Sequence, residues 1–431
     1  MSTHGSGRIP VPNIDHIEIG RRLGLFMVDP LVGQGLPLFA PPGAKILQVL
    51  QRFIEDEEER RGYQITQTPV MAKSDLYKVS GHWDLYKEHM FVVDQEEELA
   101  LRPMTCPFQF LIYKSALRSY RDLPIRYSET SKLFRNEFSG SMHGLIRMRQ
   151  FTLADGHIIC RLDQIEQEFN AALELAEFVM SAIGFGEVWC RLSKWDPQRK
   201  DKFIDNPEAW TRSEACLREV LQRRSVAFVE AVGEAAFYGP KLDIQTRNVY
   251  GKEDTVVTIQ LDFALADRFD LSYTDASGNR ARPVIIHRSS IGCYERTLAY
   301  LLELTQGRLP FWLSPVQLAV LTVSEKFSDF GAKVVDALRE VGCRCELDGG
   351  ADKLGRKILG ARERLVPVAA IVGQKEAEAQ TISLRYLDGG EVAGVAVDRF
   401  VHEVKMAVGR RDLRFSLSDG VGSLPCAQRA D

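Results

Sequence analysis

The chain has 431 residues, 45% of them hydrophobic and 26% charged, and its formal net charge at pH 7 is −4. This composition is typical of a soluble globular protein with room for two or three domains. It excludes a strongly basic protein, so a nucleic-acid partner has to bind a local positive surface. The eight cysteines include no Cys-x-x-Cys pair, and no stretch is apolar enough to span a membrane. We therefore expect a cytoplasmic protein without a disulfide framework.

The first three quarters of the chain mix strand-like segments with amphipathic helices. Residues 1–14 predict a flexible tail, and the spacing of apolar residues then predicts a long helix over 42–62. Residues 63–71 predict a strand that Pro69 interrupts, which places it at a sheet edge or a subunit boundary. Further strands are expected at 99–104, 124–137, 145–160, 237–245, 256–265 and 269–275, with a helix at about 163–183. This mixture predicts an α+β fold rather than a doubly wound sheet.

The pattern changes near the proline-flanked segment 309–317, which suits a domain boundary. From there strands and helices alternate, which predicts a small α/β domain with parallel strands over 313–410. Residues 411–431 have weak periodicity and predict a disordered tail. The domain organisation expected is therefore a tail, a large domain over 15–312, the small domain and a second tail.

The segment 133–151, LFRNEFSGSMHGLIRMRQF, concentrates charge in two strand-like pieces around a turn. Side chains two apart on a strand share a face, so Arg135 projects with Glu137, and Arg147 with Arg149 and Phe151. Arginine binds phosphate or carboxylate bidentately, and an aromatic ring can stack on a base, so the hairpin suits a nucleotide pocket. A solvated hairpin with cross-strand ion pairs is the alternative that spacing alone leaves open.

Several motifs resemble those of the class II aminoacyl-tRNA synthetases. FRNE followed by RMRQF resembles motif 2, residues 291–304 resemble motif 3, and the Pro69 region resembles motif 1, which builds the dimer interface. SGHWDLYKEHMF, RPMTCP, AAFYGPKLDI, TIQLDFAL and PVIIHRSSIGCYER further resemble the threonyl-tRNA synthetase family, in that family's order over roughly 15–410. The resemblance implies a catalytic domain built on an antiparallel sheet over 15–312, followed by an anticodon-binding domain.

The resemblance also implies roles for single residues in activating threonine with ATP and Mg²⁺. Arg135 is expected to hold the α-phosphate and the amino-acid carboxylate, while Glu137 and Phe151 bind adenine. The resemblance assigns Arg147 and Arg296 to the γ-phosphate, Lys241 to the reacting phosphate, Gln260 to ATP and the amino acid, and His82 to transfer onto tRNA. Cationic groups placed where charge develops are the expected catalytic contribution.

The family uses one cysteine and two histidines to bind a catalytic zinc, which here correspond to Cys106, His157 and His287. These residues are 51 and then 130 positions apart and carry no local zinc signature, so spacing alone favours ordinary packing. Three protein ligands leave a position where threonine binds through its amine and hydroxyl, whereas valine has no hydroxyl. The resemblance also implies that Asp155 pairs with the ammonium, and that Tyr238 and Met104 contact the amino acid.

Serine differs from threonine by one methyl, worth only about 1–3 kcal/mol of discrimination. Because the catalytic resemblance begins almost at once, we expect a short form with no editing domain in cis, which makes some Ser-tRNA. The pocket also departs from the family pattern at Thr105, Phe108, Gln109 and Leu153, where the familiar bacterial sequence has Asn, Gly, His and Gln. These departures leave amino-acid preference open.

In the C-terminal domain, Glu376 and Arg385 match family positions that contact anticodon bases. Lys353, Arg356 and Lys357 share a helix face and form either a phosphate-contacting stripe or a solvated face. The resemblance therefore implies a homodimeric threonine–tRNA ligase that uses L-threonine, ATP and tRNA(Thr). The alternatives are a regulatory tRNA-binding paralogue, and a duplicate ligase serving inhibitor tolerance or a non-tRNA acceptor.

Overall fold

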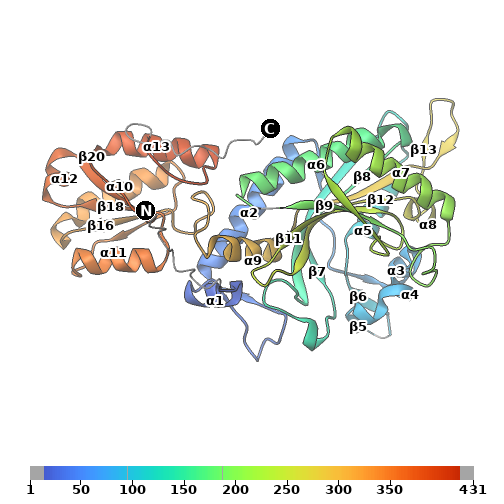
Figure 1. The fold of residues 1–431 in the computed structure, drawn as a ribbon, viewed down its shortest axis with the longest axis horizontal. Helices are drawn as coiled ribbons and strands as arrows, with labels where there is room; N and C mark the ends of the chain where they lie inside the picture. Colours follow the sequence, from blue (N-terminus) through green and yellow to red (C-terminus); the bar gives the residue numbers. More distant parts are fainter. Residues whose placement is uncertain (1–13, 95, 187, 418–431) are drawn as a thin grey trace, which may run out of the picture. The chain divides into compact units, whose positions relative to one another are not determined.

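The computed structural model describes residues 14–417, except 95 and 187, and the chain divides into two compact units after Gly307 (Figure 1). The predicted domain boundary at 312 is therefore five residues late. Phe311 explains the difference, because its ring is buried against Phe415 in the core of the second unit, which also contains Phe400. The predicted N-terminal tail, apart from Ile14, and residues 418–431 of the predicted C-terminal tail lie outside the described residues.

The first unit is built on an eight-stranded sheet, and its α+β class is as predicted (Figure 1). Only the pairs β3–β7 and β9–β10 in this sheet are parallel. In sheet order the strands are β10 (Phe228–Val232), β9 (Trp189–Lys194), β11 (Lys241–Arg247), β12 (Glu253–Asp262), β15 (Val284–Cys293), β8 (Gln150–Cys160), β7 (Ile125–Phe134) and β3 (Gln64–Ile65). The central antiparallel strands β8, β12 and β15 carry five of the residues that the sequence singled out, namely Phe151, Asp155, His157, Gln260 and His287.

Helices cover this sheet by burying one apolar face each. Helix α2 (Pro41–Arg60) starts with prolines at its first turn, where no backbone N–H is needed, and buries Ile46, Leu50 and Phe53. Helices α6 (Ile165–Ala182) and α9 (Tyr294–Thr305) pack against β15 and β8. The other helices of this unit are α1 (His16–Arg22), α3 (Ser74–Ser80), α4 (His82–Tyr86), α5 (Cys106–Lys114), α7 (Pro207–Arg223) and α8 (Leu265–Arg268).

Three small sheets complete the first unit. They are formed by β1 (Phe26–Met27) with β2 (Leu38–Phe39), by β4 (Met71–Lys73), β6 (Leu99–Leu101) and β5 (Val92–Asp94), and by β13 (Tyr273–Thr274) with β14 (Arg280–Ala281). The segment around Pro69 thus joins two short strands, β3 and β4, and does not form one continuous strand. Proline has no N–H for a sheet ladder, which accounts for the break.

The second unit is a five-stranded sheet in the order β17 (Cys345–Asp348), β16 (Leu318–Thr322), β18 (Val368–Val372), β19 (Thr381–Tyr386) and β20 (Glu391–Ala396). The predicted parallel arrangement holds for the first three strands and is wrong for β19 and β20, which pair antiparallel. The turn Asp388–Gly390 makes a hairpin possible there, since both glycines have positive φ. The helices are α10 (Ser328–Glu340), α11 (Leu354–Glu363), α12 (Gln374–Ala379) and α13 (Val397–Arg410).

The predicted disorder from 411 onward is wrong for residues 411–417. The Leu413 carbonyl accepts a hydrogen bond from the Phe311 N–H at 2.8 Å, and Phe415 is buried against Phe311 and Phe400. A single aromatic residue in a polar segment gives no periodic signal, although it is enough to fix this stretch. Within the described residues, no helix has the length and hydropathy needed to cross a bilayer.

Candidate active site

Three potential metal ligands converge where β8, β15 and helix α5 meet. His157 on β8 and His287 on β15 are direct cross-strand partners, and their ring centroids lie 4.7 Å apart. Cys106 is the first residue of α5, whose start faces these strands. One ligand atom from each of the three residues lies within 4.8 Å of the others, and all three side chains are buried. The strand register therefore brings together residues that are far apart in the sequence.

Each histidine is held through one ring nitrogen by a buried neighbour. The Nδ1 of His157 lies 2.5 Å from the Gln109 Oε1, and the Nε2 of His287 lies 2.8 Å from the Asp262 Oδ2. Gln109 and the Asp262 carboxylate accept, so the two rings carry their protons on these nitrogens and keep the opposite nitrogen free for a cation. The fixed tautomers match the requirement of a metal site.

The protonation of the three groups follows from their burial. Burial lowers the pKa of His157 well below its usual value, so its ring is neutral and has a lone pair to donate. Burial, followed by the charges of Asp155 and Asp262, raises the pKa of the Cys106 thiol well above its usual value. A thiolate there needs a bound cation to stabilise it. One thiol and two imidazoles are a donor set that suits zinc, and three ligands leave a position open, so the residues fit this metal.

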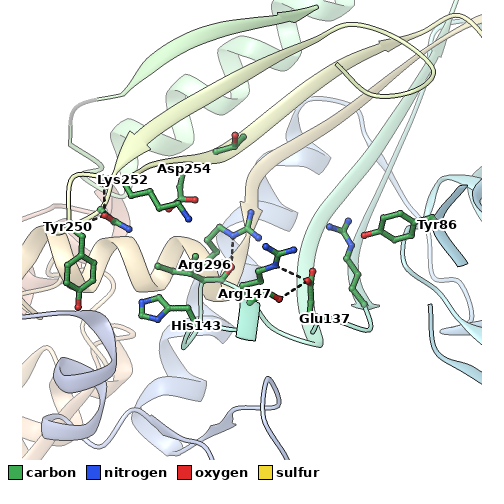
Figure 2. A pocket seen from close by; sticks show the side chains of 13 residues that line it. Tyr86, Glu137, His143, Arg147, Tyr250, Lys252, Asp254 and Arg296 are labelled. Carbon is green, nitrogen blue, oxygen red and sulfur yellow. Dashed lines mark hydrogen bonds and ion pairs between the residues drawn. The ribbon is translucent and has the colours of Figure 1, made fainter. Parts of the chain in front are cut away.

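A cavity of about 540 Å³ lies beside the 133–151 segment (Figure 2). Motif 2 residues form one wall, the turn between β11 and β12 forms another, and Arg296 of α9 lies between them. Arg147 Nε donates to Glu137 at 2.8 Å, so the two predicted nucleotide-binding side chains are paired. The lining residues are Tyr86, Arg135, Glu137, Ser141, His143, Ile146, Arg147, Asn248, Tyr250, Lys252, Asp254, Thr255 and Arg296.

A second cavity of about 250 Å³ shares Arg135, Thr255 and Arg296 with the first. Phe151, Leu153, Asp155, Gln260 and His287 are also among the residues that line it. The Arg135 guanidinium lies over the Phe151 ring at 5.0 Å, and its buried Nε has no hydrogen-bond partner among the described residues. A buried donor without a partner is costly unless a ligand satisfies it, so Arg135 is well placed to bind an anion between the two cavities.

Other contacts fix the walls of the smaller cavity. Tyr238 stacks on the His287 ring at a centroid distance of 4.9 Å, and its hydroxyl donates to the Gln260 carbonyl oxygen. Burial raises the pKa of Asp155, the carboxyl group predicted to pair with an ammonium. A cationic partner would oppose that effect of burial and favour the carboxylate. Asp155 is therefore an acidic partner for an amine, and it lies close to the two histidines.

Residues of motif 3 hold motif 2 in place through hydrogen bonds. The Glu295 carboxylate accepts from the Thr152 N–H at 2.9 Å and from the Thr152 hydroxyl, and Arg296 Nε donates to the Ile146 carbonyl at 2.9 Å. Gly292 has φ +77°, and a Cβ there would lie 2.0 Å from the Val256 carbonyl oxygen. Glycine is therefore required where β15 passes β12 before α9 begins.

The comparisons with known proteins agree with this geometry. Residues 86–305 match the family described as tRNA synthetase class II core domain (G, H, P, S and T), and residues 317–406 match the anticodon binding domain. A solved structure of the RNA binding domain of threonyl-tRNA synthetase from Cryptosporidium parvum is 35% identical, with a TM-score of 0.86 over 94% of this chain and 100% of that one.

The chain belongs to the threonyl-tRNA synthetase family of the class II tRNA synthetases. A threonine–tRNA ligase from Clostridium perfringens is 55% identical over 92% of this chain, and one from Oceanobacillus iheyensis is 42% identical over 93%. The chain spans about 63% of the length of the first and 62% of the second. The predicted fold class, a class II core followed by an anticodon-binding domain, is confirmed.

Several residues that the threonyl-tRNA synthetase pattern marks are not among those that line the two cavities, and Lys241, His82 and Met104 are three of them. Lys241 pairs with Asp243 at 2.9 Å and is the cross-strand partner of Gln260. His82 begins α4, is buried, and lies 2.8 Å from the Ser80 hydroxyl. Met104 packs against a buried cluster that includes Cys106. Their predicted roles stay predictions.

In the anticodon-binding unit the predicted residues have intramolecular partners. Glu376 accepts from the Gly373 N–H at 3.1 Å and from the Ser383 hydroxyl at 2.8 Å, and Arg385 pairs with Glu391 at 3.0 Å. An anticodon base would have to replace these contacts.

The predicted stripe Lys353, Arg356, Lys357 is wrong for Lys357. Its side chain is buried, and its ammonium donates to the carbonyls of Thr322, Asp348 and Gly350 at 3.0, 3.1 and 2.7 Å. Helical spacing showed that the three residues are neighbours and not which of them faces the sheet.

Sequence reasoning missed the groups that hold the site in place. Asp262 lies two residues after Gln260, so strand periodicity could have placed both on the same face. Gln109 was noticed only as a departure from the family pattern, and its contact with His157 depends on how α5 packs. No local signal in the sequence points to it.

Proposed function

We propose that this protein is a threonine–tRNA ligase, which activates L-threonine with ATP and transfers it to tRNA(Thr). The observation that carries the proposal is the Cys106–His157–His287 cluster beside a cavity that also contains Arg135 and Asp155. Its 55% identity to a curated threonine–tRNA ligase supports the same substrate class. The cluster recognises a hydroxyl next to an amine, and the larger cavity provides room for a nucleotide.

The residues divide the activation step between the two cavities. Arg135 binds the α-phosphate and the threonine carboxylate, so that a carboxylate oxygen attacks the α-phosphorus and pyrophosphate leaves. Arg147 and Arg296 hold the outgoing phosphates, Glu137 accepts from the adenine amine, and Phe151 stacks on the base. Lys241 on β11 and its cross-strand partner Gln260 on β12 act close to the reacting phosphate and the amino acid. The guanidinium groups stabilise the charge that spreads over the phosphates in the transition state. ATP binds with Mg²⁺, as is general for the class.

The metal cluster accounts for amino-acid choice. Zinc, when bound by Cys106, His157 and His287, supplies Lewis-acid positions for the amine and hydroxyl of threonine. Asp155 accepts a hydrogen bond from this amine, which binds without its extra proton, while Tyr238 and Met104 enclose the side chain. Valine fills only one of these two positions, because it has an amine and no hydroxyl, and it is strongly rejected since a site built for a hydroxyl loses that bond. Serine satisfies them, so discrimination against it depends on one methyl.

Further partners follow from the same proposal. The anticodon-binding unit meets tRNA(Thr), with Glu376 and Arg385 as base-contacting candidates, and His82 assists transfer to the ribose. Exposed apolar side chains at Ile65, Val70 and Met71 support a homodimer through the Pro69 region. The mass of the protein in solution, measured by light scattering, tests whether it forms this homodimer.

The test of the activity is ATP–pyrophosphate exchange with threonine, serine and valine side by side, with zinc content measured on the same sample. We expect one zinc per chain, exchange with threonine, weaker exchange with serine and almost none with valine. Cys106→Ala should lose zinc and threonine-dependent exchange together. A protein that holds no zinc and shows no threonine-dependent exchange would contradict the proposal and favour the regulatory paralogue. No feature of the two cavities favours that paralogue.

A further inference from the structure

His16 is a buried histidine far from the metal cluster and outside every family motif used above. It is the first residue of α1 and is fully buried. Its Nδ1 lies 2.7 Å from the Glu303 Oε1 on α9, and its Nε2 lies 3.1 Å from the Leu145 backbone nitrogen in the motif 2 loop. The ring therefore joins an N-terminal helix, the motif 3 helix and the motif 2 loop.

The partners leave one arrangement of protons on this ring. The backbone N–H of Leu145 can only donate, so Nε2 accepts and carries no proton. The other nitrogen, Nδ1, then carries the proton and donates it to the Glu303 carboxylate. Both ring nitrogens are satisfied without charge on the ring. His16 thus acts as an adaptor between a loop amide and a helix carboxylate.

The same carboxylate holds a second segment. Glu303 Oε2 accepts from the Val249 N–H at 3.2 Å, in the turn between β11 and β12. In that turn the Tyr250 hydroxyl donates to Asp15 Oδ2 at 3.0 Å, one residue before His16. The N-terminal helix and Glu303 are therefore connected to the turn as well as to the motif 2 loop.

These two segments are opposite walls of the larger cavity. His143, Ile146 and Arg147 line it from the motif 2 loop, and Asn248, Tyr250 and Lys252 line it from the turn. In Figure 2 His143 lies between Tyr250 and Arg147. The distance between the walls, and so the shape offered to a nucleotide, depends on groups that do not line the cavity themselves.

The approach of His16 to the loop is close enough to restrict the sequence there. Gly144 has φ +47°, and a Cβ at this position would lie 2.1 Å from the His16 Nε2. The His143 ring stands edge-on to the His16 ring at a centroid distance of 5.4 Å. The loop thus fits onto the imidazole with no room for a larger residue, so the ring defines the position of the loop.

We propose that His16, through Leu145 and Glu303, is a positioning residue that sets the ATP-binding geometry of the motif 2 loop. This inference rests on the proposed function only in assigning the larger cavity to ATP. It predicts that loss of the Nε2 contact raises KM for ATP, whereas KM for threonine, which binds at the smaller cavity, is unchanged.

Two nearly isosteric variants separate the two ring contacts. An asparagine amide reaches the position of Nδ1, and a glutamine carbonyl reaches the position of Nε2. His16→Asn therefore keeps a donor for Glu303 and loses the acceptor for Leu145, whereas His16→Gln keeps the acceptor. His16→Ala removes both, and Arg21→Ala, an exposed change on the same helix that removes only the pair with Glu18, is the matched control.

The first readout is hydrogen exchange of the Leu145 amide in the full chain without ligands. We expect faster exchange in His16→Asn and His16→Ala, and near wild-type exchange in His16→Gln and Arg21→Ala. The second readout is pyrophosphate exchange, where KM for ATP should rise about tenfold in the first two variants, the equivalent of one hydrogen bond, with KM for threonine within twofold of wild type.

Thermal unfolding separates positioning from simple packing. Equal increases of both KM values in proportion to lost stability, or unchanged ATP use in His16→Asn, would overturn the proposal. Rescue by His16→Gln of both the Leu145 protection and KM for ATP supports it. Exchange of the Leu145 amide needs no amino acid, and neither does the affinity for ATP when it is measured directly by calorimetry. These two measurements decide the matter even if the wild-type chain failed to activate threonine, an outcome that would contradict only the proposed function.

Discussion

Gln109→Ala should weaken zinc binding although Gln109 is not a predicted ligand. The Gln109 side chain is fully buried, accepts from His157 Nδ1 at 2.5 Å and donates through Nε2 to the Thr66 hydroxyl at 2.7 Å. Truncation leaves the His157 N–H without a partner in an apolar site and frees its ring to rotate. An unsatisfied buried donor costs about 1–3 kcal/mol, and loss of the partner that orients a metal-binding histidine lowers metal affinity about 10- to 100-fold.

The assay is competition for zinc against a chromophoric chelator at constant pH, with bound metal counted by mass spectrometry. Gln245→Ala is the matched control, since Gln245 is also buried in the first unit and donates to the Thr255 hydroxyl at 2.6 Å. We expect the control to retain wild-type zinc affinity. Gln109→Glu should lie between the two, because a carboxylate still accepts from His157. If Gln109→Ala bound zinc within twofold of wild type, the argument that Gln109 orients His157 would be refuted.

Three further outcomes follow from the structure. Burial lowers the pKa of His82 to about 3, whereas the pKa of an unperturbed histidine is about 6.5. As the pH falls below 6.5, His82 therefore takes up a proton in the unfolded chain and stays neutral in the folded one, which lowers stability. Between pH 6.5 and 5 the free energy of unfolding, measured with urea at each pH, should drop by about 1.5 kcal/mol more in wild type than in His82→Gln. Glu58→Ala leaves the buried Arg288 guanidinium without its carboxylate and should cost about 3–5 kcal/mol in the same assay at neutral pH. Gly292→Ala forces a Cβ against the Val256 carbonyl at positive φ, so it should lower stability by at least about 2 kcal/mol and raise KM for ATP, with unchanged values contradicting the close approach.

Sequence alone predicted the residue types of the site better than their arrangement. The spacing of Cys106, His157 and His287 contains no zinc signal, because the register between β8 and β15 brings the histidines together across 130 residues. Only resemblance to a family could connect them. Strand periodicity likewise placed Arg147 and Arg149 on a regular strand, whereas β8 begins at Gln150 and Arg149 bonds to both Gly35 and Arg135 through its backbone.

The second unit shows why the buried face of a helix is even harder to predict from sequence than the register of strands. An i, i+4 spacing identifies neighbours on a helix and does not say which neighbour faces the core. Lys357 packs inward because three carbonyl oxygens and the Asp348 carboxylate, 3.6 Å away, surround its ammonium. Those partners lie on other segments, so no window of sequence around Lys357 includes them all. Lys353 and Arg356 remain exposed, as a phosphate-contacting pair requires.

The departures from the family pattern differ in kind once their surroundings are known. Gln109 supports His157, and the Thr105 hydroxyl lies 2.6 Å from the Ser131 hydroxyl, so both take part in buried polar contacts. Leu153 instead adds an apolar surface to the smaller cavity. Polar groups that already have buried partners are poor candidates for altering substrate choice, because any change in them disturbs the ligands first. Of these three departures, Leu153 is the one through which an altered amino-acid preference is expected to act, because it lines the smaller cavity and carries no side-chain hydrogen bond to lose.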